Sequence, residues 1–180
     1  MCLSFFGCFR AGELCLTDND KFSPKTHLTF KDCVIDTSLR SVAITLKHSK
    51  TDSFSEGVIV KIGCSGTPIC AFCLTSQYLA THPSPLANSP LLLDSNLTVL
   101  RKSYFVATTK LILAASGYDP SHYSGHSFRA GSATSGASAG FSAWELKMLG
   151  RWSSNAYQIY LRNSDLVTSF AHRLAGSDHE

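Results

Sequence analysis

The sequence lacks long hydrophobic runs and carries little charge. No apolar stretch approaches the roughly twenty residues that a transmembrane helix needs, so neither a membrane span nor a membrane partner is predicted. Only 16% of the 180 residues are charged, against 44% hydrophobic, which excludes a chain that is disordered throughout. This length and composition fit one globular domain with a sizeable core.

The chain also lacks a strong excess of positive or negative charge. The net charge of +3 and the pI near 8.5 permit a polyanionic partner such as nucleic acid, but they do not require one. A basic groove depends on a local excess of cations, which the net charge does not report.

The cysteines lack the pattern of a disulfide framework or of a zinc finger. Seven scattered cysteines are an odd number, which favours reduced thiols and an intracellular location. Cys70 and Cys73 have the spacing of a zinc ligand pair, with Cys64 just upstream, but a four-ligand site needs a second pair, and none follows. We therefore expect no metal and no cofactor, with Cys70 and Cys73 packing as small apolar residues on one helix face.

The first third of the chain predicts a short helix and a small sheet. The apolar opening, which ends at Leu16, resembles the second half of a helix, so we expect the domain to be truncated at its start. Three runs rich in β-branched residues, over 28–35, 41–49 and 57–63, predict a three-stranded antiparallel sheet because their connections are short and polar. The second hairpin carries Lys50.

Helices are predicted for most of the remainder. A short one is expected from Pro68 to Tyr78, and a longer one over 98–116. Ser124 is expected to cap a helix over about 125–139, and Ser142 with Glu145 forms a capping box for a helix that ends at Gly150. The apolar face predicted for 98–116 contains Leu100, Tyr104, Ala107, Leu111 and Ala114. The fold class is therefore α+β, mainly helical, in a single domain over 1–180.

One pair of residues in the helix over 125–139 suggests an anion site. His126 and Arg129 are three residues apart, so both side chains lie on one helix face near its positive N-terminus, where they can reach one phosphate. When no other motif accompanies it, such a pair more often lies on a solvated helix face. Whether it indicates a phosphate site depends on the motifs around it.

Five motifs in order resemble the catalytic domain of tyrosine recombinases, the phage-integrase superfamily, and especially the forms of Crypton and DIRS-like eukaryotic mobile elements. The resemblance covers nearly the whole chain and rests on Arg10 with Glu13 in FRAGEL, Lys50 in HSKTDSFSEGVIV, His126 with Arg129 in GHSFRAG, Trp152 in LGRW, and Tyr160 in AYQIYLR. It implies DNA strand breakage and rejoining, as in site-specific recombination or integration. It also implies a separate core-binding domain, which we expect this chain to lack.

The resemblance assigns the nucleophile and the proton donor. Tyr160 would attack a phosphodiester to form a 3′-phosphotyrosyl link, and Lys50 would protonate the leaving 5′ oxygen, with no metal ion required. Tyr157 is the rival nucleophile and is expected to pack instead. Lys47 is a rival to Lys50 because a shift of hairpin register would exchange them.

The resemblance also assigns the groups that stabilise the phosphorane. Arg10 and Arg129 would present planar guanidinium donors to the non-bridging oxygens, a geometry that lysine lacks. His126 and the indole N–H of Trp152 would complete the donor set, and Glu13 would orient Arg10 or His126.

The family has a histidine or tryptophan position between the HxxR motif and the tyrosine, and its match in this chain is ambiguous by one residue. Many members have histidine directly after LG, where this chain has Arg151 followed by Trp152. Trp152 is the preferred match by residue type, and it could equally be a core residue. Arg151 and Lys47 are expected to contact the DNA backbone, while Trp144, which belongs to no motif, is expected in the core.

Two other functions stay open. The chain could be a non-catalytic DNA-binding or protein-interaction remnant of a mobile-element recombinase, or a type IB topoisomerase-like nicking enzyme. Double-stranded DNA is the expected partner, and the location would be nuclear in a eukaryote. A helix expected over 163–174 would dock onto a neighbouring protomer on DNA and make a homo-oligomer.

Overall fold

The computed structural model describes residues 1–47, 57–83 and 86–160. In this part of the chain it confirms an α+β fold with six α-helices and one three-stranded antiparallel sheet, and no helix there is long and apolar enough to cross a membrane. In chain order the elements are α1 (Cys2–Phe6), α2 (Ala11–Leu14), the 3₁₀ turn η1 (Phe30–Asp32), β1 (Cys33–Asp36), β2 (Ser41–Leu46), β3 (Val58–Gly63), α3 (Ala71–Ala80), α4 (Lys102–Ala115), η2 (Pro120–His122), α5 (Ser127–Ser138), α6 (Ala143–Gly150) and η3 (Asn155–Tyr160).

The sheet has the predicted strands in the order β1-β2-β3. The central strand, β2, buries every second residue, and Ile44 at its centre is fully buried. The first strand is shorter than the predicted 28–35. Thr29 and Asp32 form a capping box that turns the chain through η1 before pairing starts at Cys33.

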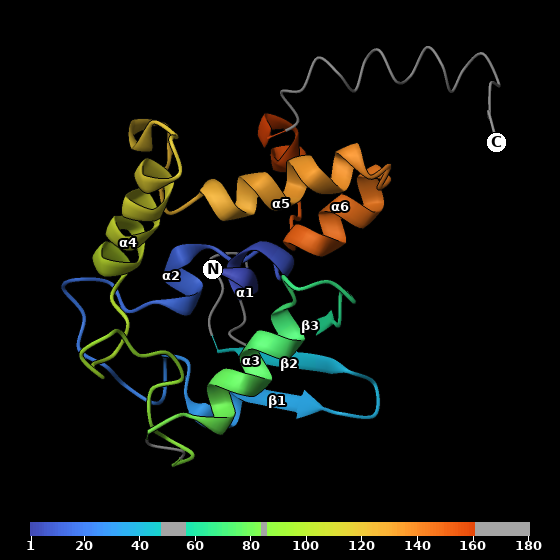
Figure 1. Cartoon of the computed structure of the whole chain (residues 1–180). Helices are drawn as coiled ribbons and strands as arrows, with labels where there is room; N and C mark the ends of the chain where they lie inside the picture. Colours follow the sequence, from blue (N-terminus) through green and yellow to red (C-terminus); the bar gives the residue numbers. More distant parts are fainter. Residues whose placement is uncertain (48–56, 84–85, 161–180) are drawn as a thin grey trace, which may run out of the picture.

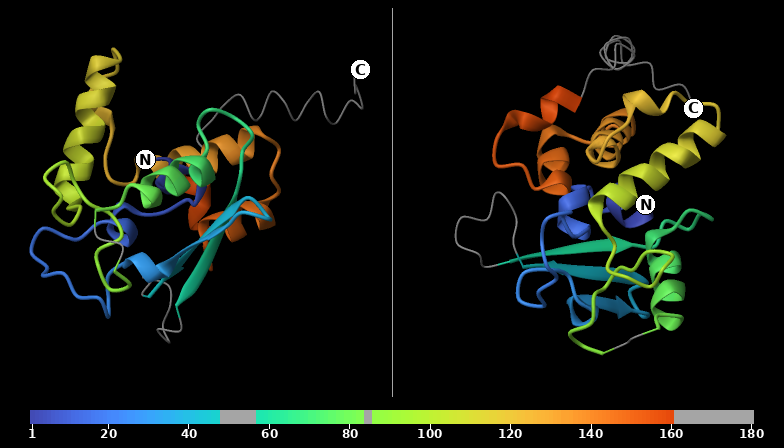
Figure 2. Two further views of the ribbon diagram at one scale, coloured as in Figure 1. Left: turned by 60° about the horizontal axis from the view of Figure 1, so that its bottom comes forward. Right: turned by 90° about the vertical axis from the view of Figure 1, so that its left-hand side faces the viewer.

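The helices form two groups on either side of the chain's first residues. Helix α3 packs against β2 and β3, while α5 packs against α6. Figures 1 and 2 show α1 and α2 between the sheet and the α5–α6 pair, and α1 contacts both α3 and α5. The first residues of the chain therefore lie between the two groups and pack against both.

Two apolar clusters follow from this arrangement. The larger joins the sheet to α1, α3 and α4, and the smaller lies between α5, α6 and η3. Cys8 belongs to the smaller cluster and Phe9 to the larger, and both are fully buried. The two cores therefore meet at two consecutive residues.

The expected continuous helix up to Leu16 is wrong. The chain instead forms two short helices, α1 and α2, separated by the turn 7–10. Cys8 adopts a left-handed backbone with φ of 48°, which ends a right-handed helix. Gly7 permits the turn, since a Cβ there would lie 2.2 Å from the Phe9 ring.

Two expectations about buried faces are also wrong. In α4 the buried residues are Phe105 and Thr109, whereas Leu111 on the predicted face is 70% exposed. Trp144, expected in the core, is 67% exposed on α6. Helical spacing identified the helices, but it did not determine which side of each helix the rest of the chain would cover.

Replacing Ile44 by alanine should lower the free energy of unfolding by about 2–5 kcal/mol, because it leaves a cavity in the sheet core. Ile59→Ala is the matched control, since Ile59 lies in β3 and is 61% exposed. Urea denaturation followed by circular dichroism measures both. Equal losses in the two variants would contradict the burial pattern.

Candidate active site at an arginine cluster

The turn 7–10 ends in an arginine that is held by its own helix. Arg10 is the N-cap of α2, and Glu13 three residues later accepts from the Arg10 backbone N–H at 2.8 Å. The other Glu13 oxygen accepts from the Arg10 guanidinium at 2.7 Å. The Glu13 side chain is 6% exposed, so this carboxylate is nearly removed from water. It therefore holds the Arg10 side chain through an ion pair.

Arg151 binds the same carboxylate from the opposite side. It is the C-cap of α6 in the left-handed conformation, and its guanidinium lies 3.0 Å from Glu13. It also donates to the backbone carbonyl oxygens of Gly7 at 2.8 Å and Cys8 at 3.2 Å, and it lies over the Phe9 ring. Arg151 therefore joins the end of α6 to the first turn of the chain.

Arg129 lies beneath this pair and is 1% exposed. Its guanidinium donates to Cys8 O at 2.6 Å and to Gly150 O, and it stacks on the Trp152 ring with 4.4 Å between Cζ and the centroid. Trp152 is itself buried, and its ring packs so closely on Gly150 that a Cβ there would lie 1.8 Å away. The planar guanidinium is thus held by two carbonyls and one indole face.

The cluster has a surplus of positive charge. Three guanidiniums, from Arg10, Arg129 and Arg151, surround the carboxylate of Glu13. Burial lowers the pKa of the Arg129 guanidinium, and the charges of Arg10 and Arg151 act in the same direction while Glu13 opposes them. An anion placed here would therefore relieve an unfavourable concentration of charge.

A cavity of about 230 Å³ opens beside the cluster. Arg10 and Glu13 line it, together with His126, the N-cap residue of α5. Lys102, at the start of α4, adds a cation that the sequence analysis missed. No local motif indicates Lys102. Its side chain reaches the cavity beside Gly125, where an added Cβ would lie only 3.4 Å from Lys102 Cε.

The structure places six of the predicted site residues at the cavity or in the cluster beside it. Arg10, Glu13 and His126 line the cavity, and Arg151 binds Glu13. Arg129 and Trp152 stack on each other and are not among the residues that line the cavity. Lys50 and the side chain of Tyr160 lie outside the described residues, so their roles stay predictions. The backbone of Tyr160 ends η3, which packs against α5 and α6.

Two alternatives for the catalytic groups are engaged elsewhere. Lys47 forms an ion pair with Asp32 and donates to the backbone oxygens of Pro24 and His27, so its ammonium already has partners in the fold. Tyr157 is 5% exposed, with its ring 6.1 Å from that of Trp152, which confirms that it packs. These contacts favour Lys50 and Tyr160 for the chemical roles.

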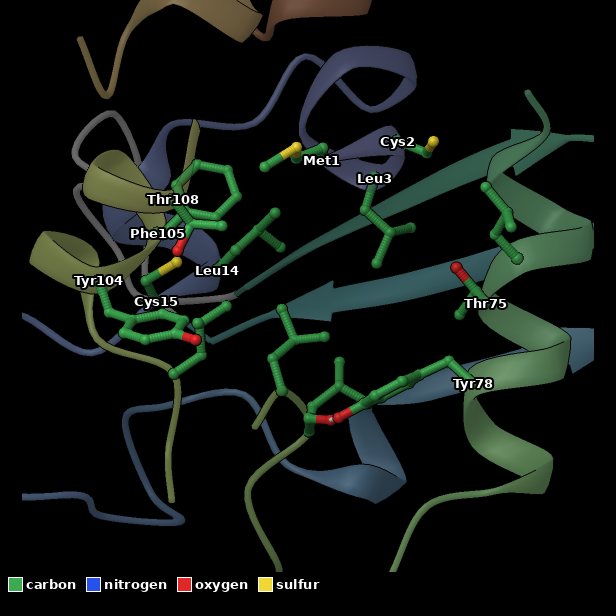
Figure 3. Close-up of a pocket in the computed structure, with 14 residues that line it drawn as sticks. Met1, Cys2, Leu3, Leu14, Cys15, Thr75, Tyr78, Tyr104, Phe105 and Thr108 are labelled. Atoms are coloured by element: carbon green, nitrogen blue, oxygen red, sulfur yellow. Dashed lines mark hydrogen bonds between the residues drawn. The ribbon is translucent and has the colours of Figure 1, made fainter. Parts of the chain in front are cut away.

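A larger cavity, of about 410 Å³, lies elsewhere in the molecule (Figure 3). It is formed between α1, α3 and α4, with Leu3, Tyr78 and Phe105 among its lining residues. Within the described part of the chain no charged side chain lines it, so it does not suit a phosphate group. The candidate active site is therefore the smaller, cationic cavity.

Comparisons with known proteins identify the fold. No model of a known protein family matches the sequence, and a search of curated proteins finds no relative. Among solved structures, the chain is similar to XerA recombinase, with 18% identity, a TM-score of 0.68 and coverage of 95% of this chain and 54% of that one. It is also similar to a XerH site-specific recombinase bound to palindromic difH substrate, with 16% identity, a TM-score of 0.66 and coverage of 95% of this chain and 43% of that one. The Tn1549 transposon integrase in complex with transposon right-end DNA has 17% identity and a TM-score of 0.60, with coverage of 97% of this chain and 57% of that one.

These comparisons show that the chain has the fold found in tyrosine recombinases and integrases. The chain spans about half the length of the solved proteins that it matches. The expected α+β fold of the recombinase catalytic domain is thereby confirmed.

Replacing Glu13 by glutamine should lower the free energy of unfolding by about 3 kcal/mol, because it leaves Arg10 and Arg151 without their buried counter-charge. Glu145→Gln is the matched control. Glu145 occupies the same capping-box position in α6 but is exposed, so its loss should be about 1 kcal/mol or less. Thermal and urea denaturation measure both variants. A Glu13→Gln protein as stable as the control would show that the carboxylate does not hold the cluster.

Proposed function

We propose that this chain is the catalytic part of a DNA strand transferase of the tyrosine recombinase type. The observation that carries the proposal is the cluster of Arg10, Arg129 and Arg151 around one carboxylate, beside a cavity lined by His126. Such a concentration of guanidinium donors suits a phosphate group that gains charge in its transition state.

The proposed reaction breaks and remakes one phosphodiester bond. The Tyr160 oxygen attacks phosphorus as its proton passes to solvent water, forming the O–P bond of a 3′-phosphotyrosyl link while the bond to the 5′ oxygen breaks. Lys50 gives that oxygen its proton, which yields a free 5′ hydroxyl. Attack by a 5′ hydroxyl reverses these steps and releases Tyr160, so rejoining consumes no ATP.

The cluster supplies the charge stabilisation in this scheme. Arg10 faces the cavity with 23% of its side chain exposed and is positioned by Glu13. His126 lines the same cavity as Arg10, and Lys102 adds a second cation. Two backbone carbonyls hold Arg129 and use two of its five N–H donors. Arg129 would therefore contact the phosphate through its remaining donors, or stabilise it as a buried positive charge without direct contact.

The solved proteins with this fold support DNA as the substrate. One XerH structure contains a difH substrate, and the Tn1549 integrase is bound to transposon-end DNA. For this chain we propose double-stranded DNA as the partner and a mobile-element origin of the Crypton or DIRS-like kind. Its location would be intracellular, and nuclear in a eukaryotic cell.

A covalent adduct tests the proposal. Nicked duplexes of randomised sequence, in which the short cleaved fragment that bears the free 5′ hydroxyl diffuses away, should trap a 3′-phosphotyrosyl protein–DNA link in the presence of a chelator. Tyr160→Phe should abolish the adduct and leave DNA affinity nearly unchanged, because only the nucleophilic oxygen is lost. Denaturing gel electrophoresis detects the adduct, and sequencing of the trapped DNA identifies the target.

Tyr157→Phe is the matched control and should still form the adduct. The measurement is made on the chain itself and on a fusion behind the DNA-clamping half of a related recombinase. An adduct that survives Tyr160→Phe would refute the assigned nucleophile, and a requirement for magnesium would refute the mechanism. DNA binding without any adduct in the fusion protein would favour the non-catalytic remnant.

Assembly on DNA through the C-terminal segment is a further part of the proposal. The segment 163–174 lies outside the described residues, and its sequence places Leu166, Val167, Phe170 and Leu174 on one helix face. Replacing these four residues by serine should leave single protomers on duplex DNA, whereas the unaltered chain should form oligomers. Sedimentation velocity on DNA measures the assembly. Unchanged oligomers in the variant would reject a role for this face.

A further inference from the structure

The segment between β3 and α3 brings three cysteine sulfur atoms together. Cys64 follows the last residue of β3, Cys70 is the N-cap of α3, and Cys73 lies in the first turn of that helix. The three Sγ atoms lie within 4.8 Å of one another, and those of Cys64 and Cys70 are 3.6 Å apart. Cys70 is buried, Cys64 is half-buried and Cys73 is exposed, so the group lies at the surface with one open side.

These separations suit thiolate ligands of one metal ion. Zinc binds cysteine sulfur at about 2.3 Å, which at tetrahedral angles places two sulfur atoms about 3.8 Å apart. The observed separations need only small side-chain rotations to reach this geometry. A disulfide between Cys64 and Cys70 would instead require the sulfur atoms to approach to about 2.05 Å.

The surroundings of the sulfur atoms also suit bound thiolates. The Arg40 guanidinium donates to Cys64 Sγ at 3.2 Å, and the backbone N–H of Cys73 donates to Cys70 Sγ at 3.4 Å. Hydrogen bonds of this kind stabilise the negative charge of a metal-bound thiolate and fix its direction. The backbone N–H of Cys64 is held by Arg40 O at 2.8 Å, so the position of this ligand is set by the sheet.

We propose that Cys64, Cys70 and Cys73 bind one zinc ion, with water in the fourth position. Soft thiolate ligands favour zinc over magnesium or calcium, and three protein ligands with one open position form a known class of zinc site. From the sequence no metal was expected, because a four-ligand site needs a second ligand pair and none follows Cys70 and Cys73. The fold supplies the third by placing Cys64 at the end of β3 against the start of α3.

The site would join the sheet to α3 at a point that shares no residue with the arginine cluster. The proposed strand transfer needs no metal, so the two proposals fail independently. A chain that binds zinc without forming a DNA adduct would retain this inference, and the reverse result would retain the other.

The test titrates the full chain, reduced and freed of metal, with cobalt(II) and then with zinc. We expect one cobalt per chain with a sulfur-to-cobalt charge-transfer band, displacement of cobalt by zinc, and a higher melting temperature with zinc bound. Cys64→Ser and Cys73→Ser should each weaken binding at least about tenfold. Because Cys73 is exposed, its replacement should leave the fold intact, which circular dichroism verifies.

Cys2→Ser is the matched control, since Cys2 lies in α1 outside the group, and it should bind one metal ion as before. Unchanged affinity in both Cys64→Ser and Cys73→Ser would overturn the proposal. So would the absence of a charge-transfer band in the unaltered chain. A Cys64–Cys70 disulfide found by mass spectrometry after purification without oxidant, in chain that takes up no zinc when reduced, would overturn it as well.

Discussion

The two apolar clusters of this structure are joined by hydrogen bonds to the backbone carbonyl oxygens of Gly7 and Cys8. Arg129 from α5 and Arg151 from the end of α6 donate to them across more than 120 positions of sequence. A carbonyl oxygen has two lone pairs, so Cys8 O can accept from both guanidiniums. Because Cys8 and Phe9 belong to different apolar clusters, these bonds determine how the two cores meet.

The same contacts explain why the site is cationic. Two arginines bind the turn 7–10 and a third, Arg10, is its last residue. Among the described residues only Glu13 supplies a negative charge to the cluster. Burial lowers the pKa of Arg129, which means that its charge is less well solvated than in water. A phosphate group would supply the missing negative charge at the cavity beside Arg10. The packing of the two cores and the proposed affinity for DNA thus arise from one set of side chains.

Local signals in the sequence predicted much of this structure, while contacts between distant segments did not follow from them. The capping box of Ser142 and Glu145 sets the start of α6 as predicted, because its hydrogen bonds lie within one turn. The break at Gly7 was missed because it depends on the ring of Phe9 and on partners from α5 and α6. Lys102 at the cavity was missed for the same reason, since tertiary packing alone brings it there. Cys64 was noted upstream of the CxxC pair, but its sulfur joins the pair only through the packing of β3 against α3.

Arg129 illustrates why the fold and the chemistry are difficult to separate by mutation. Its planar guanidinium donates in two directions, to Cys8 O and Gly150 O, and stacks on Trp152, which a lysine ammonium cannot reproduce. A substitution at Arg129 would therefore remove a support of both cores together with the positive charge proposed to act on the phosphate, and lost activity would not distinguish the two. Tyr160 differs because the proposed chemistry requires only its phenolic oxygen. The proposed nucleophile, rather than the buried arginine, is therefore the residue at which catalysis can be tested apart from folding.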